Sequence, residues 1–228
     1  MKKLGLLIIA LVFISAIRVN PPRKGSFNLP TAPLVKAPKD FVSNQLYTYT
    51  DTTGKVWTAP VQTITDGASI PKPALAIIGD RYDDPYVGAA LVHDAYCSSE
   101  NNKGASFHKA SWRQVHRMFY DACVAGGTNP VKAKIMYAAV WLFGPRWEFP
   151  TPGRSPASTG SISKARMEIN ELDISSAPAT QQKAQLNEII DYINDKDPEL
   201  DVLDGVMEAS AYSLKSNRVL TLPGAGTK

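Results

Sequence analysis

The middle of the chain contains three consecutive apolar segments, each bounded by residues that start or stop helices. They span residues 84–97, 111–125 and 129–144. Asp84-Pro85 and Asn129-Pro130 each place a capping side chain before a proline, the arrangement that favours a helix start, and glycines follow the second and third segments. The pattern therefore predicts a core of three helices.

The residues before these helices predict β-structure. The segment 41–50 alternates loosely between apolar and polar residues, 51–54 is the turn sequence Asp-Thr-Thr-Gly, and 55–58 resumes the alternation. This order is typical of a β-hairpin. A further strand over 61–65 would place Asp66 at its end. The expected fold class is α+β, with a small antiparallel β-hairpin or sheet packed on the three-helix core over residues 40–150.

The N-terminal segment resembles an export signal. Residues 1–17 combine Lys2-Lys3 with an apolar run that is shorter than the roughly 20 residues of a membrane-spanning helix. We expect an exported protein that is either periplasmic or anchored to the inner membrane by this segment. Both outcomes stay open, because Ile14 occupies a position where signal cleavage favours a small residue. Residues 18–39 contain five prolines and no hydrophobic period, so they predict a tether.

The C-terminal part of the chain has a different composition. Residues 151–161 are rich in Pro, Gly, Ser and Thr and predict a linker, and residues 162–228 predict a helical extension with segments at 164–172, 179–194 and 202–214. These helices either cover the core domain or bind a protein partner. Intramolecular packing is the commoner use of an apolar helix face.

The charge of the chain argues against nucleic acid as a partner. The formal net charge is +4, and two of the cations are Lys2 and Lys3. Proteins that bind nucleic acid concentrate Lys and Arg on one face, and no such run is present here.

Candidate chemistry is concentrated in three segments of the core. His93-Asp94 lies near the end of the first helix, Asp66 and Ser69 follow the last strand, and His116 lies on the second helix. As catalytic groups we expect His93, Asp94, Asp66 and Ser69. As ligands of a divalent metal ion, zinc or calcium, we expect His93, His116, Asp66 and Asp94. The alternative is a structural network in which these polar groups join helix to strand through buried hydrogen bonds.

The first two helices can pair in a register that brings two histidines together or in one that allows a disulfide, but not in both. If residues 98–108 connect them as an antiparallel pair, His93 and His116 lie at nearly the same level, whereas Cys97 and Cys123 are offset by roughly 16 Å. A disulfide requires Cα atoms within about 7 Å, so it cannot form in that register. We favour the histidine pair, although two cysteines in an exported chain favour a disulfide.

These segments resemble a known family. The stretches Thr65–Pro71 (TDGASIP), Ala89–Asp94 (AALVHD) and Met118–Tyr120 (MFY) are similar to the core pattern of domain of unknown function family 1353, found in bacteria and phages. The similarity covers roughly residues 55–147 and implies a shared pattern without an activity. The chain departs from that pattern at Cys97, where an aromatic residue is usual, and at His116, where an acidic residue is usual.

A second, shorter resemblance concerns the His-Asp dipeptide. His93-Asp94, with Tyr96 and Cys97 close behind, resembles the active helix of secreted phospholipase A2 enzymes, in which the histidine activates water and the aspartate binds calcium. The chain lacks the cysteine-rich framework and the glycine-rich calcium loop of that family. The resemblance therefore suggests a substrate class and no more.

The sequence predicts an exported hydrolase that uses a His/Asp site, with or without a metal ion, on a cell-envelope component such as peptidoglycan or lipid. The competing hypothesis is a non-enzymatic envelope or phage-associated protein with a structural or interaction role, in which the polar cluster stabilises the fold.

Overall fold

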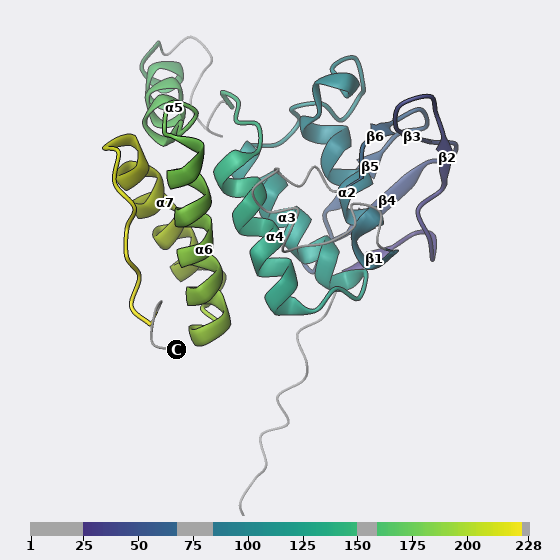
Figure 1. Ribbon diagram of the computed structural model, residues 1–228. Helices are drawn as coiled ribbons and strands as arrows, with labels where there is room; N and C mark the ends of the chain where they lie inside the picture. Colours follow the sequence, from purple (N-terminus) through teal and green to yellow (C-terminus); the bar gives the residue numbers. More distant parts are fainter. Residues whose placement is uncertain (1–24, 68–83, 150–158, 225–228) are drawn as a thin grey trace, which may run out of the picture.

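The computed structural model describes residues 25–67, 84–149 and 159–224 (Figure 1). The fold is α+β as predicted, with two three-stranded antiparallel sheets and a helical core that continues into C-terminal helices. The described elements are β1 (Ser26–Phe27), β2 (Leu34–Lys36), β3 (Phe41–Ser43), β4 (Tyr47–Thr50), β5 (Val56–Ala59), β6 (Ile64–Thr65), α2 (Asp84–Cys97), the 3-10 helix η1 (Ser99–Asn101), α3 (Trp112–Ala125), α4 (Pro130–Phe143), α5 (Thr159–Leu172), α6 (Ala179–Lys196) and α7 (Leu200–Lys215).

The predicted hairpin is formed by β4 and β5. These strands pair antiparallel, with Tyr49 opposite Trp57, and lie in a sheet of order β1-β4-β5. Asp51 fixes the turn, because its Oδ1 accepts hydrogen bonds from the backbone N–H groups of Thr53 and Lys55 at 2.9 and 3.0 Å. The side chain of Asp51 thus performs the turn function that the sequence predicts for this segment.

The strand expected over residues 41–50 is divided between two sheets. β3 belongs to the second sheet, of order β2-β3-β6, whereas β4 belongs to the first. The chain leaves β3 at Asn44, whose backbone N–H donates to the carbonyl of Pro33 at 2.9 Å. The expected last strand over 61–65 is shorter, since only β6 at its end pairs with β3.

Two short strands lie where the sequence predicts a proline-rich tether. β1 pairs with β4 and β2 pairs with β3, so part of the stretch 18–39 is built into the sheets. Both are edge strands of two or three residues, the position in a sheet where neighbouring prolines are tolerated. Pairing with distant strands, which a local pattern does not reveal, gives this segment its structure.

Helix α2 lies at the centre of the molecule, between the sheets and the pair α3 and α4 (Figure 1). Every residue from 88 to 97 is buried. Asn101 joins the end of α2 to β6, because its side-chain amide donates to the carbonyls of Ile64 at 2.8 Å and Asp94 at 2.9 Å. Polar side chains on α2 must therefore find partners inside the protein.

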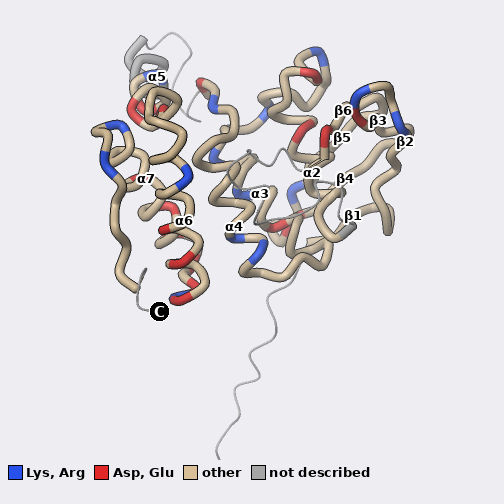
Figure 2. The backbone as a smooth tube through the Cα atoms, viewed as in Figure 1, with Lys and Arg blue, Asp and Glu red and all other residues tan. Residues whose placement is uncertain are grey.

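The C-terminal helices cover the outer side of α4. Residues 133–142 of α4 are all buried, because α3 packs on one side of the helix and α6 and α7 on the other. Ion pairs reinforce the junction: Arg117 on α3 pairs with Asp201 and Asp204 on α7, and Lys134 on α4 pairs with Asp197 at 2.5 Å. Figure 2 shows where basic and acidic residues lie along the backbone. The extension is thus packed against the core.

Across the described ranges, no helix combines the length and the apolar character needed to cross a membrane. The expected signal or anchor over residues 1–17 lies outside those ranges.

The packing of α2 on β4 predicts opposite effects for two glycine substitutions. A Cβ at Gly88 would lie 2.5 Å from Oη of Tyr47, a side chain that is 2% exposed and stacked on Phe27. We expect Gly88→Ala to lower the free energy of unfolding by about 1 to 3 kcal/mol through overpacking. Gly205 on α7 has nothing within 4 Å of a built Cβ, so Gly205→Ala should raise it by up to about 1 kcal/mol. Denaturant titration of both variants measures this difference, and equal stabilities would contradict the packing.

Candidate metal centre

Helices α2 and α3 bring His93 and His116 into direct contact. His93 Nε2 lies 2.9 Å from His116 Nδ1, with ring centroids 5.1 Å apart. This is the register in which the two imidazoles share a level. In agreement with it, Cys97 and Cys123 are both free and both buried.

A backbone carbonyl determines the tautomers of the two imidazoles. His116 Nε2 lies 3.2 Å from the carbonyl oxygen of Pro145, which only accepts, so Nε2 carries the proton and Nδ1 of neutral His116 is an acceptor. His93 Nε2–H therefore donates to His116 Nδ1. In neutral His93, the remaining lone pair is on Nδ1.

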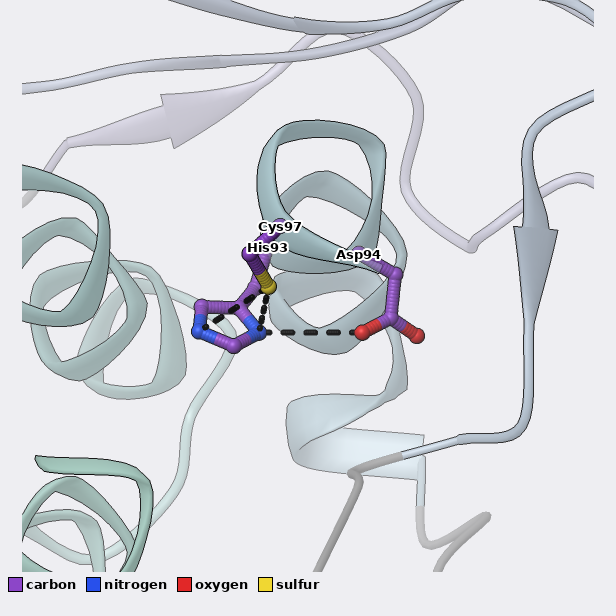
Figure 3. A group of neighbouring side chains, drawn as sticks. All are labelled: His93, Asp94 and Cys97. Atoms are coloured by element: carbon purple, nitrogen blue, oxygen red, sulfur yellow. Dashed lines mark hydrogen bonds and ion pairs between the residues drawn. The ribbon is translucent and has the colours of Figure 1, made fainter. Parts of the chain in front are cut away.

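Two further donor atoms on the same helix lie close to the His93 ring. Cys97 Sγ lies 3.3 Å from Nδ1 and 3.6 Å from Nε2, so the sulfur is over the face of the ring, and Asp94 Oδ1 lies 3.7 Å from Nδ1 (Figure 3). One ligand atom from each of these residues lies within 4.8 Å of the others. The side chains come from adjacent positions and the next helical turn, so α2 alone assembles the group.

Hydrogen bonds from β6 orient the carboxylate of Asp94. Thr65 Oγ1 donates to Asp94 Oδ2 at 2.6 Å, and Thr65 Oγ1 in turn accepts from the backbone N–H of Gly67 at 3.1 Å. The other carboxylate oxygen, Oδ1, is left facing His93. The strand end thus positions the aspartate, as the sequence pattern suggests.

Burial changes the proton affinities in this cluster. His93, Asp94 and Cys97 are 3%, 2% and 5% exposed, and His116 is completely buried. Desolvation raises the pKa of Asp94. It also raises the pKa of Cys97, and the negative charges of Asp94 and Asp66 add to that increase. Desolvation lowers the pKa of His116, and the neighbouring His93 adds to this effect. Burial therefore makes the thiolate and the carboxylate less favourable when no cation is present.

The expected site residues are placed differently from one another. His93, Asp94 and His116 belong to one network of polar contacts. Both ring nitrogens of His116 are engaged in it, so His116 orients the His93 ring and offers no nitrogen to a metal ion. Asp66 follows β6 half-buried, outside the three-residue donor group, and Ser69 lies outside the described residues.

Cys97 was not among the expected site residues. Its signal in the sequence is its spacing, since it lies four residues after His93 on the same helix face.

Comparisons with known proteins connect this core to a family. Residues 42–140 match the family "Protein of unknown function (DUF1353)". The match confirms the resemblance carried by the strand-end and His-Asp segments. It covers Asp66, His93, Cys97 and His116, so the whole cluster lies within the matched residues.

Two curated relatives come from Sinorhizobium fredii. "Uncharacterized protein y4iH" is 39% identical over 110 residues, which are 48% of this chain and 43% of that protein. "Uncharacterized protein y4jT" is 29% identical over 187 residues, which are 75% of this chain and 53% of that protein. The chain thus matches about half the length of each relative. No solved structure matches it.

The histidine register predicts the state of the two cysteines. We expect both thiols to resist a small alkylating reagent in the folded protein, because burial shields them and raises the pKa of each. Both should react once denaturant is added without reductant. Mass spectrometry of the alkylated chain counts them. A chain that takes up no reagent in denaturant alone would contain a disulfide, which would contradict the contact between His93 and His116.

Proposed function

We propose that this protein is a metal-dependent hydrolase with zinc bound by His93, Asp94 and Cys97, and that it acts on a cell-envelope component. The observation that carries the proposal is the convergence of three donor atoms within 4.8 Å in a buried site. Three protein ligands with a fourth position for water are the usual arrangement of catalytic zinc.

The distances between the donor atoms suit a single ion. Atoms that bind one tetrahedral zinc at about 2.0 to 2.3 Å lie roughly 3.3 to 3.7 Å from each other. His93 Nδ1 is 3.3 Å from Cys97 Sγ and 3.7 Å from Asp94 Oδ1. For the three atoms to share an ion, the Cys97 side chain must turn so that Sγ moves from over the ring toward the lone pair of Nδ1, which lies in the ring plane.

The surrounding hydrogen bonds leave the required lone pairs free. The series of hydrogen bonds from Pro145 through His116 to His93 keeps Nδ1 of neutral His93 unprotonated. Thr65 donates to Oδ2 of Asp94, the oxygen that faces away from His93. Histidines that bind metals typically donate their second N–H to a nearby acceptor in this way. His116 is that acceptor here.

The donor types favour zinc over calcium. Zinc accepts nitrogen, sulfur and oxygen ligands, whereas calcium takes six to eight oxygens. The thiol of Cys97 therefore argues against the calcium chemistry that the His-Asp dipeptide suggests by its likeness to phospholipase A2.

The proposed reaction is hydrolysis by zinc-activated water. A zinc ion lowers the pKa of its bound water toward 7 and polarises a carbonyl or phosphoryl group. The N-terminal segment, with its export pattern, supports an envelope substrate such as peptidoglycan or lipid. A non-enzymatic envelope protein whose cluster is structural is the competing hypothesis that the experiments below distinguish.

The proposed site predicts that each chain binds one zinc ion and that this binding requires Cys97. Purified protein loaded with zinc and then desalted should retain one zinc per chain by elemental analysis. Cys97→Ser should weaken zinc binding by at least about 100-fold, the upper end of what the loss of an outer-shell partner causes. Cys123→Ser is the matched control, because Cys123 is equally buried but lies outside the donor group. Equal zinc retention by the two variants would rule out the site.

The hydrolase proposal predicts that one carboxylate is required for turnover. Zinc-loaded protein should release products from peptidoglycan or from phospholipid vesicles, and Asp94→Asn should reduce that rate at least about 100-fold, in the range expected for loss of a catalytic group. The amide keeps an oxygen to accept from Thr65, so the fold should survive.

Asp191→Asn on the exposed side of α6 serves as the control for that variant and should leave the rate unchanged. Stoichiometric zinc without release of product from either substrate would refute the hydrolase proposal on these substrates and favour a structural role for the cluster.

A further inference from the structure

A cleft separate from the two-histidine contact lies beside the turn of the hairpin. Its volume is about 390 Å³, within the usual range for small-molecule sites. The turn between β4 and β5, one face of α3, and α7 of the C-terminal extension line it. It shares no residue with the zinc donor group, so an inference drawn from it is independent of the proposed function.

The cationic groups of this cleft are already engaged. Arg117 forms ion pairs with Asp201 and Asp204, and Arg113 pairs with two glutamates of the C-terminal helices, at 2.9 and 2.6 Å. The ammonium group of Lys55 lies 3.6 Å from the centroid of the Trp57 ring. Each of these three cations therefore has a partner.

One of the carboxylates is also satisfied. Asp51 accepts from Trp57 Nε1 at 2.9 Å through Oδ2, and through Oδ1 it accepts from Thr53 and Lys55 in the turn. These bonds lower the pKa of Asp51. Its carboxylate is thus part of the turn structure.

Asp121 differs from the charged groups of the cleft described so far. Its side chain is half-buried on α3 and, within the described residues, makes no hydrogen bond or ion pair. Burial raises its pKa to about 6. The charge of Asp51 acts in the same direction, and the Arg117 guanidinium opposes both. At neutral pH an ionised carboxylate therefore faces the cleft, and no donor among the described residues bonds to it.

We propose that this cleft binds a small polar ligand through a primary ammonium group that donates hydrogen bonds to Asp121. An ammonium group matches the charge that the cleft leaves uncompensated, and its three N–H donors match a carboxylate that has none. The side-chain amide of Gln114 and the hydroxyl of Thr53 line the same cleft. Thr53 Oγ1 donates to Asp51 and can still accept, and Gln114 Oε1 is bonded to Ser111 while its amide N–H groups can donate. Hydroxyl groups on the ligand can use both, so an amino alcohol or amino sugar suits the site.

The test uses the full-length protein and three probe amines. Ethanolamine, putrescine and glucosamine are titrated at pH 7.5 and low salt, and binding is followed by calorimetry and by NMR shifts of the cleft residues. At least one amine should saturate the site with a dissociation constant below about 10 mM. Ethylene glycol, 1,4-butanediol and glucose, which replace ammonium by hydroxyl, should bind at least about 10-fold more weakly.

Asp121→Asn is the decisive variant. It should weaken amine binding at least about 10-fold, whereas Asp191→Asn, which removes the same charge from the exposed face of α6, should bind like the wild type. Binding should also weaken at pH 5, where Asp121 is protonated. The melting temperature of Asp121→Asn at pH 7.5 should equal or exceed that of the wild type, because a half-buried charge without a donor is removed.

Three outcomes would overturn this inference. They are failure of every amine to saturate, equal binding of the neutral analogues, and unchanged binding to Asp121→Asn. Zinc retention in the same variant should be normal, so the result is separable from the fate of the zinc site.

Discussion

The enclosure of α2 on all sides is the constraint on which the rest of the structure depends. Ten consecutive residues, 88–97, are buried, and among them are an imidazole, a carboxyl and a thiol. Buried polar groups require partners, and the side chains of Asp94 and His93 obtain theirs from β6 and α3. Thr65 and His116 supply them. The two sheets and the helix pair are therefore joined through the same few polar contacts that form the candidate site.

Local signals in the sequence were enough to predict the helices and the histidine pair. Capping residues and glycines mark the ends of α3 and α4: Asn129 is the observed N-cap of α4, as predicted, and Ser111, the expected start of the second helix, is the N-cap of α3. The contact between His93 and His116 follows from antiparallel packing and the helical rise alone. These features depend on short-range chemistry and simple geometry, which a single sequence reveals.

The remaining features depend on contacts between distant segments. β1 and β2 acquire structure only by pairing with β4 and β3. The cleft around Asp121 combines the β4–β5 turn with α3 and α7, and no local pattern brings those three together. Cys97 is an intermediate case: its position on the helix face was evident, but the ability of the neighbouring Nδ1 of His93 to bind an ion depends on the tautomer that the Pro145 carbonyl determines through His116.

The charge of the proposed zinc site is consistent with its burial. A thiolate from Cys97 and a carboxylate from Asp94 together balance the two positive charges of the ion, and His93 binds as a neutral ligand. Charges that lie in contact and sum to zero are far less costly to bury than separate ions, because their mutual attraction offsets the cost of removing them from water. The raised pKa values of Asp94 and Cys97 describe the same two groups without a cation. Binding of zinc would therefore release protons, and its affinity would rise with pH until both groups are ionised.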